Sequence, residues 1–195
     1  VLLSEAQGLT QRLKTYDARL NDVSAEINSR LATEATTVTT IADSIAKLNA
    51  QIVTAQAQGQ PPNDLLDARD QQLSALSEHL NVQVVKQDDG AWNVFVGNGQ
   101  SLVLGNQPAK LVAQRDALDP SRLNIAYQNG SATTDMSSTL SGGTLGGALD
   151  FRREMLDPVR NQLGQIAVGV ASVVNAKQRQ GMDLQGALGT DLFAL

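Results

Sequence analysis

The sequence predicts a mainly α protein with a small antiparallel β insertion, arranged as an elongated bundle of long helices. Apolar residues recur at steps of three and four in the segments near both ends of the chain, which is the helical period. The segment 81–127 instead alternates apolar and polar residues, as strands do. Apolar residues make up 42% of the chain but aromatic residues only 3%, so the core must be aliphatic, which favours helix packing.

Residues 1–60 predict one long helix, because no Pro and no central Gly interrupts them before Gly59. Its apolar positions follow the alternating three- and four-residue steps of a heptad seam. The seam residues are Leu13, Leu20, Val23, Ile27, Val38, Ile41, Ile45, Leu48 and Ile52. Two successive four-residue steps, from Val23 through Ile27 to Leu31, shift this seam and should locally unwind a left-handed supercoil.

A helix of about 50 residues is roughly 75 Å long and has no core of its own. We therefore expect it to pack against other helices, either in this chain or in neighbouring subunits. Gly59, Pro61 and Pro62 end it, and a shorter antiparallel helix follows to residue 80. Asn63 is the predicted N-cap of that second helix, so 1–80 forms a helical hairpin.

The segment 81–127 predicts a small β-meander. Turn signals at 88–90 and 97–99 separate short runs of alternating residues. Residues 128–143 are rich in Gly, Ser and Thr and predict a loop. A long helix over 144–180 then packs on the first two, and 181–195 leaves as an extended segment toward a further domain.

Pro158 is the one residue that does not suit the 144–180 helix. Either the helix kinks there, or Asp157 caps a new helix that has Pro158 in its first position. We expect the kink. The chain also begins without Met and already in a helical pattern, and we expect it to be a piece of a longer protein.

Composition excludes several classes of function. The formal net charge is −5, with 20 acidic and 15 basic residues, and no basic run offers a face to nucleic acid or anionic lipid. No apolar run approaches the roughly 20 residues that span a bilayer. The chain has no cysteine, which removes disulfides, thiol catalysis and thiolate metal sites. We therefore expect no nucleic-acid partner, no membrane partner and no cofactor.

Few residues suggest catalysis or metal binding. Asp64, Asp67 and Asp70 share helix faces and could hold a cation, but acidic residues are also common in the first turn of a helix. His79 is the sole histidine and has no second ligand for zinc. The glycines of 142–147 lack the Gly-Lys-Ser/Thr of a phosphate loop, so close backbone approach explains them better. The turn at 88–90 lacks the spacing of a calcium loop. We predict no enzymatic activity and no catalytic, cofactor or metal site.

Three ordered blocks resemble the flagellar hook-associated proteins, and together they cover most of residues 40–190. The first runs from Ile45 to Ile52 and continues, after a variable tract, with the motif residues Asn63, Asp64, Leu65, Leu66, Asp67, Arg69 and Asp70. The second is 142–152. The third contains Asn175, Gly181 and Asp183. The family often has His three residues after the Asn of the third block, where this chain has Gln178.

The resemblance implies a structural component of the bacterial flagellum at the junction between hook and filament. Its expected partners are other copies of itself in a ring, the hook protein and the second junction protein. It also implies an extracellular location, export without a cleaved signal peptide, and an export chaperone bound through a C-terminal region beyond this chain. Without the family's terminal regions, this chain should be monomeric. The alternative is an extracellular or signalling coiled-coil binding module that uses the β insertion for recognition.

Overall fold

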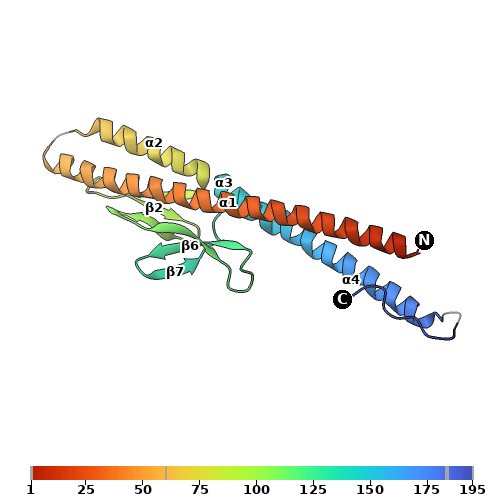
Figure 1. Ribbon diagram of the computed structural model, residues 1–195. Helices are drawn as coiled ribbons and strands as arrows, with labels where there is room; N and C mark the ends of the chain where they lie inside the picture. The colour runs from red at the N-terminus through yellow and green to blue at the C-terminus, as the bar shows by residue number, and fades with distance from the viewer. Residues whose placement is uncertain (1, 60, 183–184, 195) are drawn as a thin grey trace. The chain divides into compact units, whose positions relative to one another are not determined.

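The computed structural model describes residues 2–59, 61–182 and 185–194, and it confirms the predicted fold class. Along the chain, two helices come first, the β insertion follows, and further helices come after it (Figure 1). The chain divides into two compact units, which we call unit 1 (Val1–Val23 and Arg153–Leu195) and unit 2 (Ser24–Arg152). Helix α1 (Leu2–Ala57) contributes to both, and the division falls at Val23, where the sequence seam shifts.

In unit 2 the C-terminal part of α1 pairs with α2 (Asn63–His79) (Figure 1). Asn63 is not the N-cap that the sequence predicted. Pro62 occupies that position, no side chain caps the helix, and the N–H groups of Leu65 and Leu66 both donate to the Pro62 carbonyl. A backbone carbonyl therefore satisfies the first turn, and Asn63 is simply the first helical residue.

The β insertion forms two antiparallel sheets, so the prediction of a single meander over 81–127 was wrong. The first sheet contains β1 (Val82–Lys86), β2 (Trp92–Val96), β3 (Gln100–Leu104) and β4 (Gln107–Pro108), in that order. Past Pro108, the Ala109 N–H still donates to the Leu102 carbonyl of β3 at 2.8 Å. After Ala109 the chain starts the second sheet with β5 (Lys110–Arg115).

The second sheet also corrects the predicted loop over 128–143. Strand β6 (Leu123–Asn129) pairs with β5 and turns directly into β7 (Ala132–Asp135). Every residue of β7 is exposed, so this strand lacks the alternation by which a half-buried strand is recognised. The dipeptide Asn129–Gly130 between them is a hairpin signal, and it lies inside the segment assigned to the loop.

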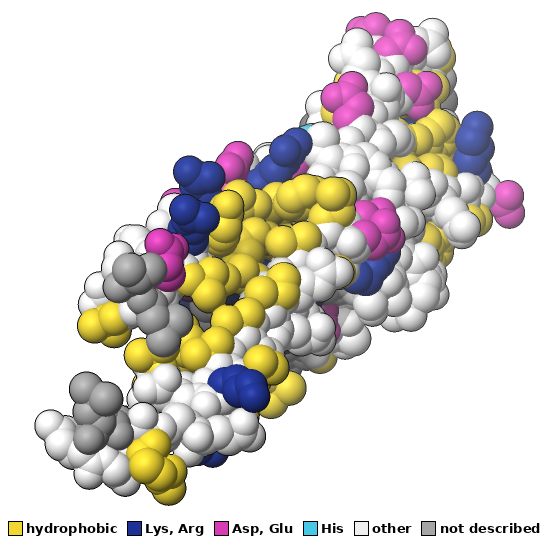
Figure 2. All heavy atoms as spheres, turned by 90° about the vertical axis from the view of Figure 1, so that its right-hand side faces the viewer, with side chains coloured by type: hydrophobic (Ala, Val, Ile, Leu, Met, Phe, Trp, Pro, Cys, Tyr) yellow, Lys and Arg dark blue, Asp and Glu magenta, His cyan; other side chains and the backbone are white. Residues whose placement is uncertain are grey.

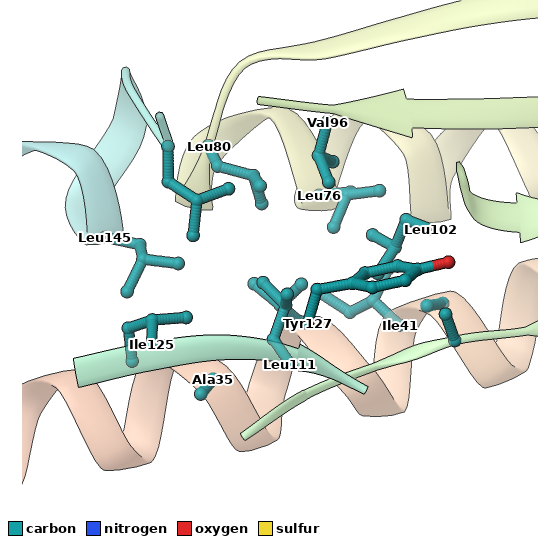
Figure 3. Close-up of a cluster of buried hydrophobic side chains, with 14 of the residues drawn as sticks. Ala35, Ile41, Leu76, Leu80, Val96, Leu102, Leu111, Ile125, Tyr127 and Leu145 are labelled. Atoms are coloured by element: carbon teal, nitrogen blue, oxygen red, sulfur yellow. The ribbon is translucent and has the colours of Figure 1, made fainter. Parts of the chain in front are cut away.

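One hydrophobic core occupies unit 2, and both sheets and three helices contribute to it. Figure 3 shows its side chains pointing toward one another from α1, α2, the strands and α3 (Gly143–Phe151). Members with no exposed surface are Leu31, Val38, Leu76, Leu80, Val94, Leu102, Val103, Ile125 and Leu145. The C-terminal part of the α1 seam is thus used inside this chain.

The segment 143–180 stays helical through Pro158, and the kink expected there stays a prediction. The irregularity lies before it, in a π-helical turn, η1 (Arg152–Leu156), which leads into α4 (Asp157–Gln180). Leu156 keeps helical angles of φ −67° and ψ −51°. A proline ring would clash with the carbonyl four residues earlier in a regular α-helix, and a wider turn relieves that clash. Among the described residues, no helix is long and apolar enough to cross a membrane.

Candidate functional site

Unit 1 leaves many of its large apolar side chains exposed. An apolar line, which we call the exposed stripe, runs from η1 along α4 at steps of four and seven residues: Met155 of η1, then Val159, Ile166 and Val173 of α4. Such spacing keeps these side chains on one helix face, and each is 45% exposed or more. Figure 2 turns the right-hand side of Figure 1 toward the viewer, and hydrophobic side chains gather on the face that it shows. Soluble monomers rarely expose a large contiguous apolar patch without a partner for it.

A groove also runs between the two helical parts of unit 1. Leu9 and Leu13 of α1 line one side, and Ala167, Val170 and Ala171 of α4 the other, around a space of about 480 Å³. Phe193 and Ala194 border the same space from the C-terminal end of the described chain. Apart from Leu156 and Ala171, unit 1 has no buried hydrophobic residue among those described. The groove is therefore only partly filled by unit 1 itself.

Asn175, one residue of the third family-like block, holds the chain end against α4. Its side chain is 1% exposed, accepts hydrogen bonds from the N–H groups of Leu192 and Phe193 (2.9 Å each), and donates one to the Phe193 carbonyl (2.8 Å). An amide suits this place because it donates and accepts from one side chain. We call residues 185–194 the C-terminal strap.

A charge pair closes the same strap onto α4. Arg179 donates through Nε and Nη2 to the two carboxylate oxygens of Asp191, at 2.5 and 2.7 Å. This two-point hydrogen bond and the positive charge of Arg179 hold the pKa of Asp191 below its ordinary value. On the other side of unit 1, Arg160 of α4 donates to Asn21 of α1. Polar contacts, rather than a hydrophobic core, thus position the parts of unit 1.

In unit 2 the motif residue Arg69 forms a buried polar cluster with Asn49. The Arg69 side chain donates to Asn49 Oδ1 at 3.1 Å and to the Gly90 carbonyl at 2.8 Å, and its guanidinium lies 3.9 Å from the centre of the Trp92 ring. Burial lowers the pKa of Arg69, although Asp70 opposes this effect. This one side chain therefore attaches α2 to α1 and to the β1–β2 turn.

Asn49 extends that cluster to the strands. Its amide nitrogen donates to the carbonyls of Trp92 and Gly105, and its oxygen accepts from the Trp92 N–H. All of the hydrogen-bonding atoms of this buried side chain therefore have partners, which is what burial of an amide requires. The sequence placed Asn49 in the first family-like block but assigned it no role.

His79 forms a contact between three helices. Its Nδ1 lies 2.6 Å from Glu34 Oε2, and Thr144 donates to the same carboxylate oxygen at 2.7 Å. The nearby glycines allow the start of α3 to approach closely, since a Cβ on Gly143 would lie 2.3 Å from the backbone carbon of His79. This geometry gives the histidine and the glycines a packing role.

The remaining predicted residues lie apart from one another. Asn63, Asp64, Asp67 and Asp70 are exposed on α2, while Leu65 and Leu66 are half-buried. Among the described residues, no group of three His, Cys, Asp or Glu side chains could hold a metal ion. Gly181 ends α4, and Asp183 lies outside the described residues.

The predicted helix seam divides between the two units. Its N-terminal members Leu13, Leu20 and Val23 are half-buried in unit 1. In unit 2, Ile27 and Leu48 are half-buried, and the buried members are Val38, Ile41, Ile45 and Ile52.

Comparisons with known proteins agree on one family. The family model described as the flagellar hook-associated protein FlgK helical domain matches residues 1–193. Flagellar hook-associated protein 1 of Escherichia coli (strain K12) is 38% identical over 198 residues, and the protein of the same name from Salmonella typhimurium is 37% identical. All of this chain is covered in both comparisons, but only 36% of each relative, so the chain spans about a third of their length.

A solved structure gives the same result. The flagellar hook junction protein FlgK from Burkholderia pseudomallei matches with a TM-score of 0.90 and 39% sequence identity. The match covers 99% of this chain and 35% of that protein. The long helices and the β insertion are thus shared with a protein of this kind.

Proposed function

This chain belongs to the FlgK helical-domain family of flagellar hook-associated proteins, and we propose that it is a structural part of the junction between the flagellar hook and the filament. The observation that carries this proposal is the exposed stripe of α4, beside a groove that unit 1 fills only in part. An apolar helix face of this kind needs a partner in the assembled state. Further helices of the assembled junction pack on it.

The two units have different parts in this role. Unit 2 is held by its own core and by the Arg69–Asn49 cluster, so it transmits load as a rigid body. Unit 1 supplies apolar helix faces that become buried only when further helices pack on them. Helices of this length carry load along their axes, and contacts between subunits pass torque from one tube to the next.

The partners follow from the same proposal. They are other copies of the protein in a ring, the hook protein and the second junction protein, with an export chaperone that binds beyond the C-terminal end of this chain. The location is the extracellular flagellum, reached without a cleaved signal peptide. The names of the relatives support a flagellar location.

The proposed role is mechanical and not catalytic. His79 and Glu34 are bound to Thr144 and to each other, so their polar atoms serve helix packing. Asp64, Asp67 and Asp70 lie exposed in the N-terminal half of α2. Negative charges there are favourable to the helix dipole and keep this surface soluble. Replacing Asp64, Asp67 and His79 together should therefore leave motility intact, provided that the protein still folds.

A complementation experiment tests the proposal. In cells lacking the gene, the full-length protein with Ile166→Glu and Val173→Glu should fail to retain filaments on hooks, because two charges are placed in a packed apolar contact. Asn161→Glu and Gln165→Glu form the matched control, since both residues are exposed on a face of α4 other than the exposed stripe. The measurement is the fraction of cells with attached filaments by electron microscopy. Normal filaments on the stripe variant, at normal protein levels, would reject the proposal.

A further inference from the structure

Three Asx–Gly dipeptides lie in turns of unit 2, and their backbone hydrogen bonds differ. They are Asp89–Gly90, Asn98–Gly99 and Asn129–Gly130. Asn followed by Gly is the sequence most prone to spontaneous loss of the side-chain amide, because glycine offers no steric barrier to ring closure. Asparagine is among the heat-labile residues of proteins for this chemical reason. The nucleophile is the backbone nitrogen of the glycine, so its hydrogen bonding decides its reactivity.

Asn129–Gly130 is the dipeptide with a free nucleophile. Because Asn129 pairs with Ala132, the β6–β7 hairpin has a two-residue loop, and Gly130 is its first residue, with φ +61°. A glycine with positive φ at that position is typical of a type II′ turn. The N–H of the first loop residue makes no hydrogen bond between the two strands, and within the described chain Gly130 N donates no hydrogen bond. The Asn129 side chain is exposed.

The other two dipeptides are protected. The β2–β3 connection has three loop residues, because Val96 pairs with Gln100, and the Gly99 N–H donates to the Val96 carbonyl at 3.1 Å. The Gly90 N–H likewise donates to Gln87, and the Asp89 carboxylate already accepts from the Ala91 N–H. In both dipeptides, the hydrogen bond from the glycine N–H to a backbone carbonyl must break before the glycine nitrogen can react.

We propose that Asn129 is a site of spontaneous deamidation in the folded protein and that Asn98 is its protected counterpart. The Gly130 nitrogen bonds to Cγ of Asn129, the Cγ–Nδ2 bond breaks, and the amide leaves as ammonia with the proton from Gly130. Water then adds to either carbonyl of the succinimide and opens the ring. The products are aspartate and isoaspartate, so one negative charge is gained without any oxidant or enzyme.

The consequences for the fold are local. Isoaspartate adds a methylene to the main chain at the last pair of the hairpin, Asn129 with Ala132, and leaves the other three pairs of β6 and β7. The residues of β6 that enter the core, Ile125 and Tyr127, lie farther along the strand. The modified protein therefore keeps its fold and carries a new charge at an exposed turn.

Peptide mapping by mass spectrometry tests this on the full-length protein, incubated at neutral pH in buffer and in concentrated urea. In buffer, amide-to-acid conversion at Asn129 should exceed that at Asn98 by roughly fivefold, the ratio expected from one backbone hydrogen bond. In urea the two rates should converge, because both asparagines precede glycine and the hydrogen bond is lost. Asn129→Gln should abolish conversion at that site, and Asn98→Gln should leave Asn129 unchanged.

Each other outcome overturns the proposal. Equal or faster conversion at Asn98 in buffer shows that the hydrogen bond does not protect it. An unchanged ratio in urea assigns the difference to local sequence instead of fold. Conversion at both sites in urea but at neither in buffer shows that the hairpin itself prevents ring closure. None of these outcomes depends on the role of the protein in the flagellum.

Discussion

Unit 2 and unit 1 bury their apolar residues in opposite ways. Unit 2 gathers side chains from three helices and two sheets into one core, and many of them have no exposed surface (Figure 3). In unit 1 the described residues include two buried hydrophobic side chains, Leu156 and Ala171, while the exposed stripe stays open. One chain thus combines a unit that has its own core with a unit whose apolar surface is suited to assembly.

Truncation of single apolar side chains should give the largest difference in stability between the two units. Leu76→Ala in unit 2 should lower the free energy of unfolding by about 3 kcal/mol, because it leaves a cavity in a packed core. Ile166→Ala in unit 1 removes a side chain that is 56% exposed and should change it by less than about 0.5 kcal/mol. Urea unfolding followed by circular dichroism measures both. Equal losses would mean that the two units do not differ in this way.

The next largest loss of unfolding free energy is expected from the polar cluster of unit 2. Arg69→Ala leaves the Gly90 carbonyl without its hydrogen bond and removes the contact with Trp92, so it should cost about 2 kcal/mol. Lys47→Ala is the matched control, since it removes a cation from an exposed position in the same unit. Trp92 is the sole tryptophan, so its fluorescence should shift in Arg69→Ala and not in the control. A loss no larger than that of the control would remove Arg69 as an attachment point.

Substitutions that release the C-terminal strap should have a smaller effect, which stays within the strap. Asn175→Ala removes three hydrogen bonds to residues 192 and 193, so amide hydrogen exchange in 189–194 should speed up by about tenfold. Exchange in the core strands of unit 2 should not change. Asn161→Ala, on an exposed face of α4, is the control. Unchanged exchange in the strap would show that the groove contact of Phe193 holds it without Asn175.

The smallest expected effect is a pH dependence of the same strap. Because the pKa of Asp191 is lowered in the folded protein, its pair with Arg179 contributes fully above the unfolded pKa of about 3.9 and is lost as the pH falls through the lower folded value. Strap exchange, corrected for its intrinsic pH dependence, should therefore rise below about pH 4. Asp191→Asn should remove this rise. A rise that persists in that variant would have to come from another carboxylate.

The sequence predicted the helices well because their periodicity extends over many residues. The α1 seam and the turn at Gly59 and Pro61 lead to the helical hairpin by local rules alone. The strands were less predictable, since β7 is short, polar and exposed, and the separation into two sheets depends on which strands pair with one another. Pairing between strands is a tertiary property that a single pattern does not contain.

The candidate site was likewise predicted only in part from the sequence. The sequence marked Arg69 and Asn175 as motif residues, but their roles depend on Asn49, Gly90 and the strap, which only folding brings near. The exposed stripe gave no distinct signal, because Val159, Ile166 and Val173 match the helical pattern as buried residues would. Periodicity identifies an apolar face and does not tell whether this chain covers it.

Thiol labelling can show whether the exposed stripe becomes covered when the flagellum assembles. The chain has no cysteine, so Ile166→Cys places one reactive group at a position that is 56% exposed. We predict that a water-soluble maleimide labels this thiol at nearly the rate of the unfolded protein in the isolated chain, and at least tenfold more slowly in assembled flagella, since a packed helix excludes the reagent. Equally fast labelling in flagella would show that the exposed stripe stays open after assembly and would contradict the account.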